Sequence, residues 1–161
     1  MIHFINNKKI QKGFTLIELL VVIGILAVLL AITLIAINPA RQFSQANNTQ
    51  RASDVNAILN AVGQYAVENN GDLSALAIPV GSASAVVVGS NTAGGQLDFC
   101  PDIVPTYIAE MPVDPQTGTW VDCTNYSSNY TIFRSATDSR ITVSAPNTEI
   151  PPAAEVISVT R

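Results

Sequence analysis

The chain of 161 residues is long enough for one modest domain and a membrane segment, but too short for two full domains. Hydrophobic residues make up 48% and charged residues only 12%, which excludes an intrinsically disordered chain. Three of the eight basic residues lie before residue 14, so the rest is acidic, and we expect no direct nucleic-acid binding because phosphate recognition needs a basic surface.

The N-terminus joins a short basic segment to a long apolar one. Three lysines precede Gly13, and no charged residue lies between Leu19 and Ile37. A helix over 14–37 would be about 36 Å long, enough to cross a hydrocarbon core of ~30 Å. The small-residue cleavage site of a secretory signal peptide does not follow it. Because basic residues before a span stay in the cytoplasm, we predict a single-pass protein of the cytoplasmic (inner) membrane with an exported C-terminal body.

One carboxylate, Glu18, interrupts the apolar run. An acid at the centre of a membrane helix costs about 2.5–3.5 kcal/mol on insertion scales, and less near an end. Such a residue tends to have a partner, so Glu18 is a candidate functional residue. The alternative is an interfacial glutamate that reaches toward lipid headgroups.

The stretch from Lys12 to Leu26, which reads Lys-Gly-Phe-Thr-Leu-Ile-Glu-Leu-Leu-Val-Val-Ile-Gly-Ile-Leu, resembles the N-terminus of bacterial type IV pilins and type II secretion pseudopilins. The resemblance implies that a prepilin peptidase cuts between Gly13 and Phe14 and methylates the new N-terminus, so that Phe14 becomes N-methylphenylalanine. It also implies polymerisation into a helical filament in which Glu18 pairs with the N-terminal amine of a neighbouring subunit.

The resemblance further implies a type IV pilin-like α+β fold, with a long N-terminal α-helix packed on a small antiparallel β-sheet. We expect four segments: a cleaved leader (1–13), a transmembrane and filament-core helix (14–37), an amphipathic continuation of that helix (38–71) and a globular region (72–161).

The segment after Ile37 predicts an amphipathic helix that ends at Asn70-Gly71. Pro39 either kinks or unwinds the long helix or begins a new helix at its first turn, and both alternatives stay open. Polar positions, Asp54 among them, separate apolar residues that recur at spacings of three and four. The predicted apolar face comprises Val55, Ile58, Leu59, Val62, Tyr65 and Ala66.

The globular region predicts short strands separated by turn residues. The stretch 72–96 is rich in Ala, Gly, Ser and Val and is interpreted as a loop with one short strand at most, and 105–111 as a short helix or turn. The predicted strands are Thr119–Thr124, Tyr130–Ser135 and Arg140–Ala145, with a further edge strand at Val156–Val159 if the tail is ordered.

Two cysteines, Cys100 and Cys123, lie after the membrane segment. An even number of cysteines in an exported body predicts a disulfide between them, and two buried free thiols are the alternative. The turn from Met111 to Gly118 contains Pro-Val-Asp-Pro and resembles the corresponding turn of major type II secretion pseudopilins, which favours that type within the family.

Nothing in the sequence indicates catalysis, because the single histidine, His3, lies in the leader and no nucleophile elbow or phosphate-binding loop is present. We predict a structural subunit without a cofactor; calcium at the Asp138-Ser139 turn is an alternative. The expected partners are further copies of the chain, related pilins, the prepilin peptidase, the inner-membrane assembly platform and lipid. The competing functions are a membrane-anchored extracytoplasmic binding domain that does not polymerise, and a minor or DNA-uptake pilin.

Overall fold

The computed structural model describes residues 13–149 and 156–161. The predicted leader, except Gly13, and the segment 150–155 lie outside the described residues. The chain divides into two compact units, residues 1–39 and residues 40–161, and each is described by itself.

The described part of the first unit contains the helix α1 (Leu16–Ala36), and none of the residues of α1 is buried. It is the one helix among the described residues that is long and apolar enough to span a membrane. Its 21 residues correspond to about 32 Å, close to the thickness of the hydrocarbon core. The side chains of α1 therefore need lipid or other apolar helices to cover them.

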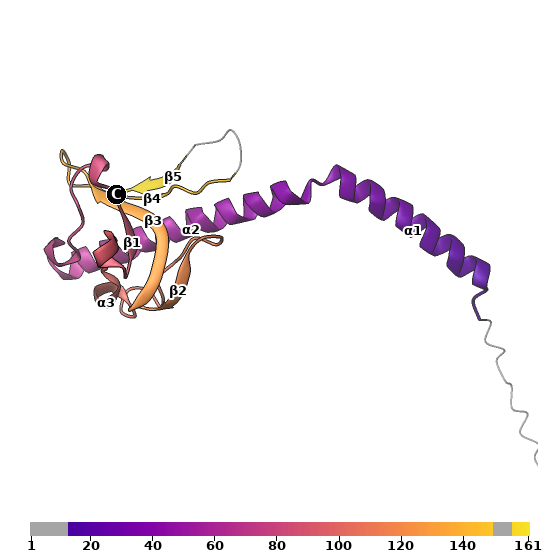
Figure 1. Ribbon diagram of the computed structural model, residues 1–161, viewed down its shortest axis with the longest axis horizontal. Coiled ribbons are helices and arrows are strands. Elements are labelled where there is room, and N and C mark those ends of the chain that lie inside the picture. The colour runs from indigo at the N-terminus through magenta and orange to yellow at the C-terminus, as the bar shows by residue number, and fades with distance from the viewer. Residues whose placement is uncertain (1–12, 150–155) are drawn as a thin grey trace, which may run out of the picture. The chain divides into compact units, whose positions relative to one another are not determined.

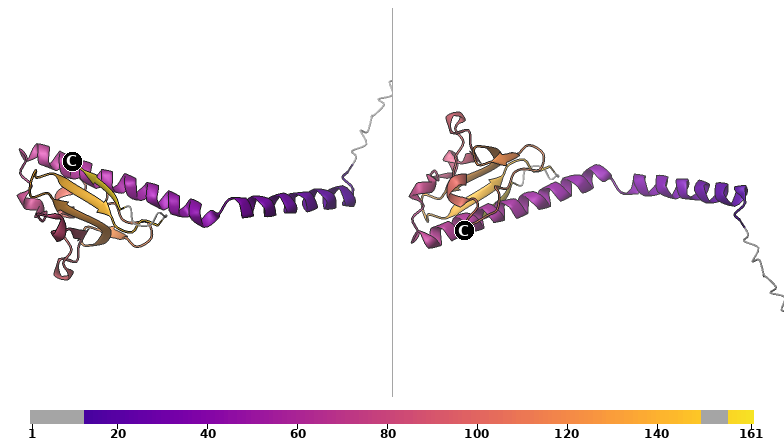
Figure 2. Two further views of the ribbon diagram at one scale, coloured as in Figure 1. Left: turned by 90° about the horizontal axis from the view of Figure 1, so that it is seen from above. Right: turned by 90° about the horizontal axis from the view of Figure 1, so that it is seen from below.

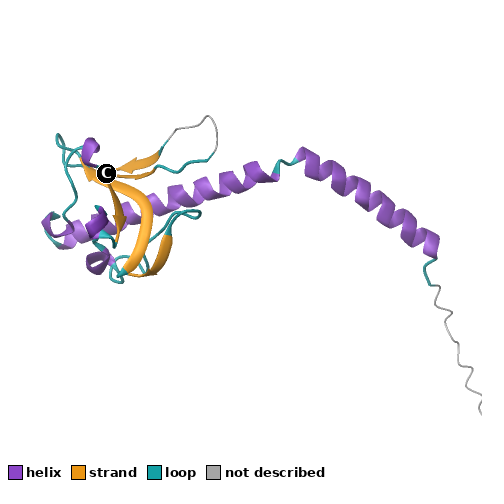
Figure 3. Ribbon diagram, viewed as in Figure 1, coloured by secondary structure: helices purple, strands orange, loops and turns teal. Residues whose placement is uncertain are grey.

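The helical part of the chain is interrupted before Pro39, where the sequence left a kink or a new helix open, because the backbone leaves the helical conformation at Ile37 and Asn38 (Figure 3). Ile37 has φ −98° and ψ 60°, and Pro39 is the first residue of the second helix, α2 (Pro39–Glu68). Pro39 disfavours a helical Asn38, yet proline is well tolerated in the first turn of a helix. The chain thus unwinds over Ile37 and Asn38, which is the first alternative left open by the sequence, and Pro39 then begins a new helix, which is the second.

The C-terminal unit packs α2 against one face of an antiparallel sheet (Figures 1 and 2). The predicted apolar face is confirmed in its first part: Val55, Ile58, Leu59 and Val62 are buried. Tyr65 packs at the edge of the same core. The N-terminal turns of α2 extend beyond the sheet (Figure 1), and residues there are mostly exposed.

The sheet has the strand order β1-β3-β4-β5, and β2 also pairs with β3. All pairs are antiparallel. The long strand β3 is central, and its alternate residues from Tyr126 to Ile132 face α2 and are buried. The strands are β1 (Val86–Gly89), β2 (Thr119–Asp122), β3 (Asn125–Arg134), β4 (Ile141–Ala145) and β5 (Ile157–Thr160). The α+β fold of a long helix on a small antiparallel sheet is confirmed.

One strand boundary differs from its prediction. The strand β3 begins at Asn125, earlier than predicted, because Asp122 closes a tight turn by accepting the backbone N–H groups of Thr124 and Asn125. The stretch 105–111 is turn and coil, which agrees with the second of its two predicted alternatives, and the short helix of this region, α3 (Cys100–Ile103), lies before it. Within 72–96 the chain also forms three 3-10 turns, at Ser74–Leu76, Ser82–Ser84 and Thr92–Gly94.

Candidate functional site

The first candidate site is the junction between the leader and α1. Gly13 and Phe14 are exposed and lie outside any helix or strand. Apart from Gly13 itself and its chain neighbours, no heavy atom of the described residues lies within 4 Å of the position that a Cβ atom would take at Gly13. A peptide bond in exposed, irregular backbone is accessible to a protease, so the geometry permits cleavage here.

Glu18 lies in the first turn of α1, where it forms a capping box with Thr15. The Thr15 hydroxyl accepts the Glu18 backbone N–H at 3.2 Å, while the Thr15 N–H and hydroxyl both donate to Oε2 of Glu18 at 2.8 Å. These two donors offset part of the cost of placing a carboxylate in apolar surroundings. Among the described residues no donor reaches Oε1 of Glu18, so this oxygen remains available to a group from another chain.

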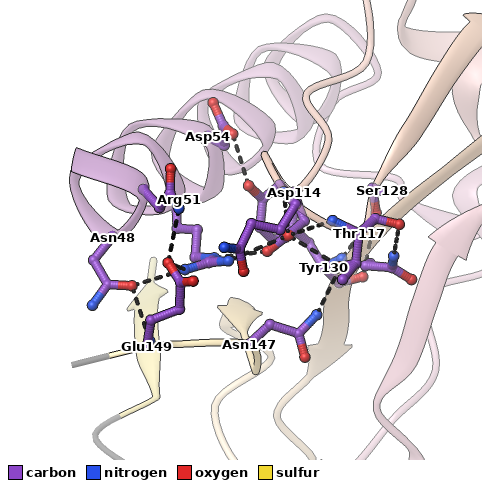
Figure 4. Close-up of polar contacts among 12 residues, drawn as sticks. Asn48, Arg51, Asp54, Asp114, Thr117, Ser128, Tyr130, Asn147 and Glu149 are labelled. Atoms are coloured by element: carbon purple, nitrogen blue, oxygen red, sulfur yellow. Dashed lines mark hydrogen bonds and ion pairs between the residues drawn. The ribbon is translucent and has the colours of Figure 1, made fainter. Parts of the chain in front are cut away.

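The second candidate site is a buried polar network in the C-terminal unit, centred on Arg51, whose exposure is 0% (Figure 4). Its Nε and Nη2 donate to the two oxygens of Asp114 at 2.7 and 3.3 Å. Its Nη1 donates to Oδ1 of Asn48 at 2.9 Å and to Oε2 of Glu149 at 3.1 Å. One guanidinium therefore joins α2 to two distant parts of the chain.

Asp114 gives the predicted turn from Met111 to Gly118 its shape. It accepts hydrogen bonds from the backbone N–H groups of Gln116 and Thr117 and from the Thr117 hydroxyl, each at 3.0 Å. Its own N–H donates to the carbonyl oxygen of Ser128 in β3 at 2.9 Å. The Pro-Val-Asp-Pro stretch is thus a turn whose aspartate binds Arg51 of α2 through its side chain and Ser128 of β3 through its backbone N–H.

A second buried carboxylate, Asp54, lies nearby on α2 (Figure 4). The Tyr130 hydroxyl donates to its Oδ2 and the Gln50 amide donates to its Oδ1, both at 2.7 Å. Burial raises the pKa of Asp54, the two hydrogen bonds oppose this, and the nearby charge of Asp114 raises the pKa further. Asp54 therefore holds a proton more readily than an exposed aspartate.

In the network around Arg51 the pKa values of the carboxylates are lowered, in contrast to the raised pKa of Asp54. Burial alone would raise the pKa of Asp114, but the hydrogen bonds from Arg51 and from the turn outweigh it and lower that pKa. The Asn47 amide, with a further contribution from Arg51, lowers the pKa of Glu149. Within the described residues no buried polar side-chain atom lacks a hydrogen bond, the pattern of a structural network rather than a reactive site.

The contacts of this network are not predicted from the sequence. Asp54 was predicted as a polar position outside the apolar face, which is wrong, since only 6% of it is exposed. A signal was present, because Arg51, Val55 and Ile58 are spaced by four and three residues and therefore share one face of α2. A charged residue in register with an apolar face indicates a buried ion pair, although its partners cannot be identified from that register.

Cys100 and Cys123 form a disulfide that joins α3 to the turn between β2 and β3. Cys100 is completely buried in the core, and Cys123 packs at its edge. The bond closes a loop between residues 23 positions apart in the sequence. It therefore restricts the unfolded chain and holds the short strand β2 near the core.

We expect the double variant Cys100→Ser/Cys123→Ser to lower the free energy of unfolding by about 3 kcal/mol, because the unfolded chain regains the entropy of the open loop. Urea unfolding of the detergent-solubilised chain can be followed by the fluorescence of Trp120, the single tryptophan. A reductant should shift the wild-type midpoint to that of the variant and leave the variant unchanged. A wild-type midpoint that reductant does not move would contradict this prediction.

Calcium at the Asp138-Ser139 turn was the alternative to a chain without a cofactor. Among the residues that the structure describes, no group of three or more His, Cys, Asp or Glu side chains could hold a metal ion. Asp138 instead accepts the backbone N–H of Arg140 at 3.3 Å within its own turn. Calcium takes six to eight oxygen ligands, which this turn does not gather.

The comparisons with known proteins concern the N-terminus. The family model described as the prokaryotic N-terminal methylation motif matches residues 8–34. The match includes Gly13, Phe14 and Glu18, and it ends within α1. Comparisons with curated proteins and with solved structures gave no significant match.

Proposed function

We propose that this chain, a protein of the type IV pilin and pseudopilin family by its prepilin-type methylation motif and its pilin-like α+β fold, is a filament subunit that polymerises through α1. The observation that carries the proposal is a fully uncovered apolar helix with one carboxylate, Glu18, in its first turn. Proteins of this family are typically structural and not enzymes.

The processing step follows from the chemistry of the junction. Hydrolysis of the Gly13–Phe14 bond by a prepilin peptidase leaves the α-amino group of Phe14 at the new N-terminus. Methylation of this amine, with the methyl group taken from a methyl donor, gives a secondary amine that remains protonated near neutral pH. The mature helix thus begins with a cation four residues before an anion.

The assembly step pairs these two charges between subunits. Oε2 of Glu18 is occupied by Thr15, and the other carboxylate oxygen is available to the Phe14 amine of a neighbour. Two charges that both lie in a desolvated helix bundle stabilise each other only when they are in contact. The pairing therefore also defines the axial register of one subunit against the next.

The apolar helix and the motif indicate an inner-membrane protein that later leaves the membrane for a filament. Before assembly, lipid would cover α1 while the C-terminal unit lies outside the cytoplasm. The partners in this scheme are the peptidase, an inner-membrane assembly platform and further pilin-type subunits. The likeness of the turn at 111–118 to that of major pseudopilins supports a subunit of a secretion pseudopilus.

Co-expression with a prepilin peptidase is expected to give a mature chain whose intact mass begins at Phe14 and carries one added methyl group. A Gly13→Val variant should remain uncut, because a branched side chain hinders access to the scissile bond. Mass spectrometry of the membrane-extracted chains measures both results. A wild-type chain that stays uncut beside a peptidase active on a control substrate would contradict the proposed function.

A further inference from the structure

The N-terminal turns of α2 carry an exposed aromatic side chain. Phe43 is 72% exposed, and it is the single exposed aromatic residue in the described part of the C-terminal unit. A lone exposed apolar side chain is ordinary on a protein surface, but aromatic residues are enriched at the centres of interfaces. Phe43 therefore indicates an interface if the same molecule also has a surface pocket that would bind its ring.

Such a surface is a pocket of about 350 Å³ beside the middle of α2. Its apolar walls include the ring of Trp120, and its carboxylates are Asp54 and Glu110. No basic side chain lines it. The lining residues are Gln50, Asp54, Ile108, Ala109, Glu110, Met111, Pro112, Val113 and Trp120.

The charges and the apolar groups of the two surfaces are complementary. The stretch 39–49 contains one charged residue, Arg41, whereas the pocket has two carboxylates. An aromatic ring suits the apolar walls, and a guanidinium is attracted both by Glu110 and by the face of Trp120. Phe43 cannot enter the pocket of its own chain, because it lies seven residues, or about 10 Å, before Gln50 on the same rigid helix.

We propose that the N-terminal turns of α2 of one copy dock into this pocket of a second copy, with Phe43 against Trp120 and Arg41 toward Glu110. The inference rests on the proposed function as a filament subunit, and it adds a contact outside the membrane helix. Because the docking segment and the pocket are different surfaces, the contact is heterologous. A repeated heterologous contact builds an open filament when the rotation between copies does not close into a ring, whereas a self-complementary contact stops at a dimer.

The test uses cysteine pairs in the full chain, expressed with its assembly machinery. Ala40→Cys lies one turn from Phe43 on the same face of α2, and Ala109→Cys lines the pocket; both positions are exposed. Because Ala40 lies ten residues, or about 15 Å, before Gln50, a reagent with a span below about 10 Å does not bridge the two cysteines of one chain. The native cysteines are joined in the disulfide, so a thiol-specific bifunctional reagent acts on the introduced pair. The matched control pairs Ala109→Cys with Val67→Cys, an exposed position farther along α2.

Sheared filaments with the first pair are expected to give a ladder of dimers, trimers and higher species, and the control pair should give monomers. Filaments without a ladder, or with dimers alone, would overturn the proposed interface while leaving the filament function intact. Absence of filaments from the unmodified chain would instead contradict the proposed function, and the interface with it.

The aromatic contact is tested separately by Phe43→Ala and Phe43→Leu. We expect Phe43→Ala to reduce the yield of sheared filaments about tenfold, as loss of an interface anchor does, and Phe43→Leu to recover most of the yield. Processing at Gly13 and the unfolding midpoint should be unchanged, because Phe43 packs against nothing in its own core. A normal filament yield from Phe43→Ala would contradict its role as an anchor.

Discussion

Glu18→Ala is expected to leave cleavage after Gly13 intact and to reduce filament formation by at least about two orders of magnitude. In the proposed filament, removal of the carboxylate leaves the Phe14 amine of the neighbouring subunit without a partner in a desolvated bundle. Loss of one member of a buried ion pair costs about 3–5 kcal/mol, which corresponds to a factor of about 100 or more in an equilibrium. Intact mass measures the processing, and the yield of sheared filaments measures the assembly.

Glu18→Gln separates the charge of this residue from its role in the helix cap. A glutamine oxygen can still accept the Thr15 N–H and hydroxyl, which both bind Oε2 in the wild type, but it carries no charge. We therefore expect Glu18→Gln to fail in assembly as Glu18→Ala does. Wild-type filament yield from either variant would refute the pairing of Glu18 with the Phe14 amine.

The composition of the mature chain offers a direct readout of this pairing. All three lysines lie in the leader, so after cleavage the amine of Phe14 is the only amino group in the chain. An amine-specific reagent should label detergent-solubilised monomers and spare intact filaments. Equal labelling of both would show that the amine is not enclosed between subunits.

Arg51→Ala is expected to lower the free energy of unfolding of the C-terminal unit by about 3–5 kcal/mol, because it leaves Asp114 buried without its ionic partner. Urea unfolding followed by Trp120 fluorescence measures the change. Arg140→Ala, at an exposed arginine, serves as the control and should change stability by less than about 0.5 kcal/mol. Similar midpoints for the two variants would contradict a stabilising role of the network.

Arg51→Ala should also change how the free energy of unfolding depends on pH in acid. The pKa of Asp114 is lowered in the folded chain, so its contribution is present above its unfolded value of about 4 and is lost as the pH falls through the folded pKa. Asp54 acts in the opposite sense, since its raised pKa favours the folded state in acid and costs stability as the pH rises above about 4. Arg51→Ala should therefore lose less stability between pH 5 and pH 2 than the wild type.

Local patterns in the sequence were sufficient to predict the helices in the N-terminal half of the molecule. An uncharged run of apolar residues predicts the membrane helix, and the apolar face of α2 follows from the spacing of Val55, Ile58 and Val62. The junction at Gly13 and Phe14 was recognised from a contiguous motif, which the family model also matches. These features depend on residues within a few helical turns of one another, so neighbouring residues carry the whole signal.

Only the tertiary structure brought together the network at the end of the sheet. Arg51 meets Asp114 across 63 positions and Glu149 across 98 positions, and no local periodicity links such distant residues. Asp54 has the composition of a surface residue, and it is buried because β3 places Tyr130 opposite it. The sequence by itself determined the prepilin-type methylation motif and which helix faces are apolar, whereas packing decided which polar side chains are buried, because burial depends on partners distant in the chain.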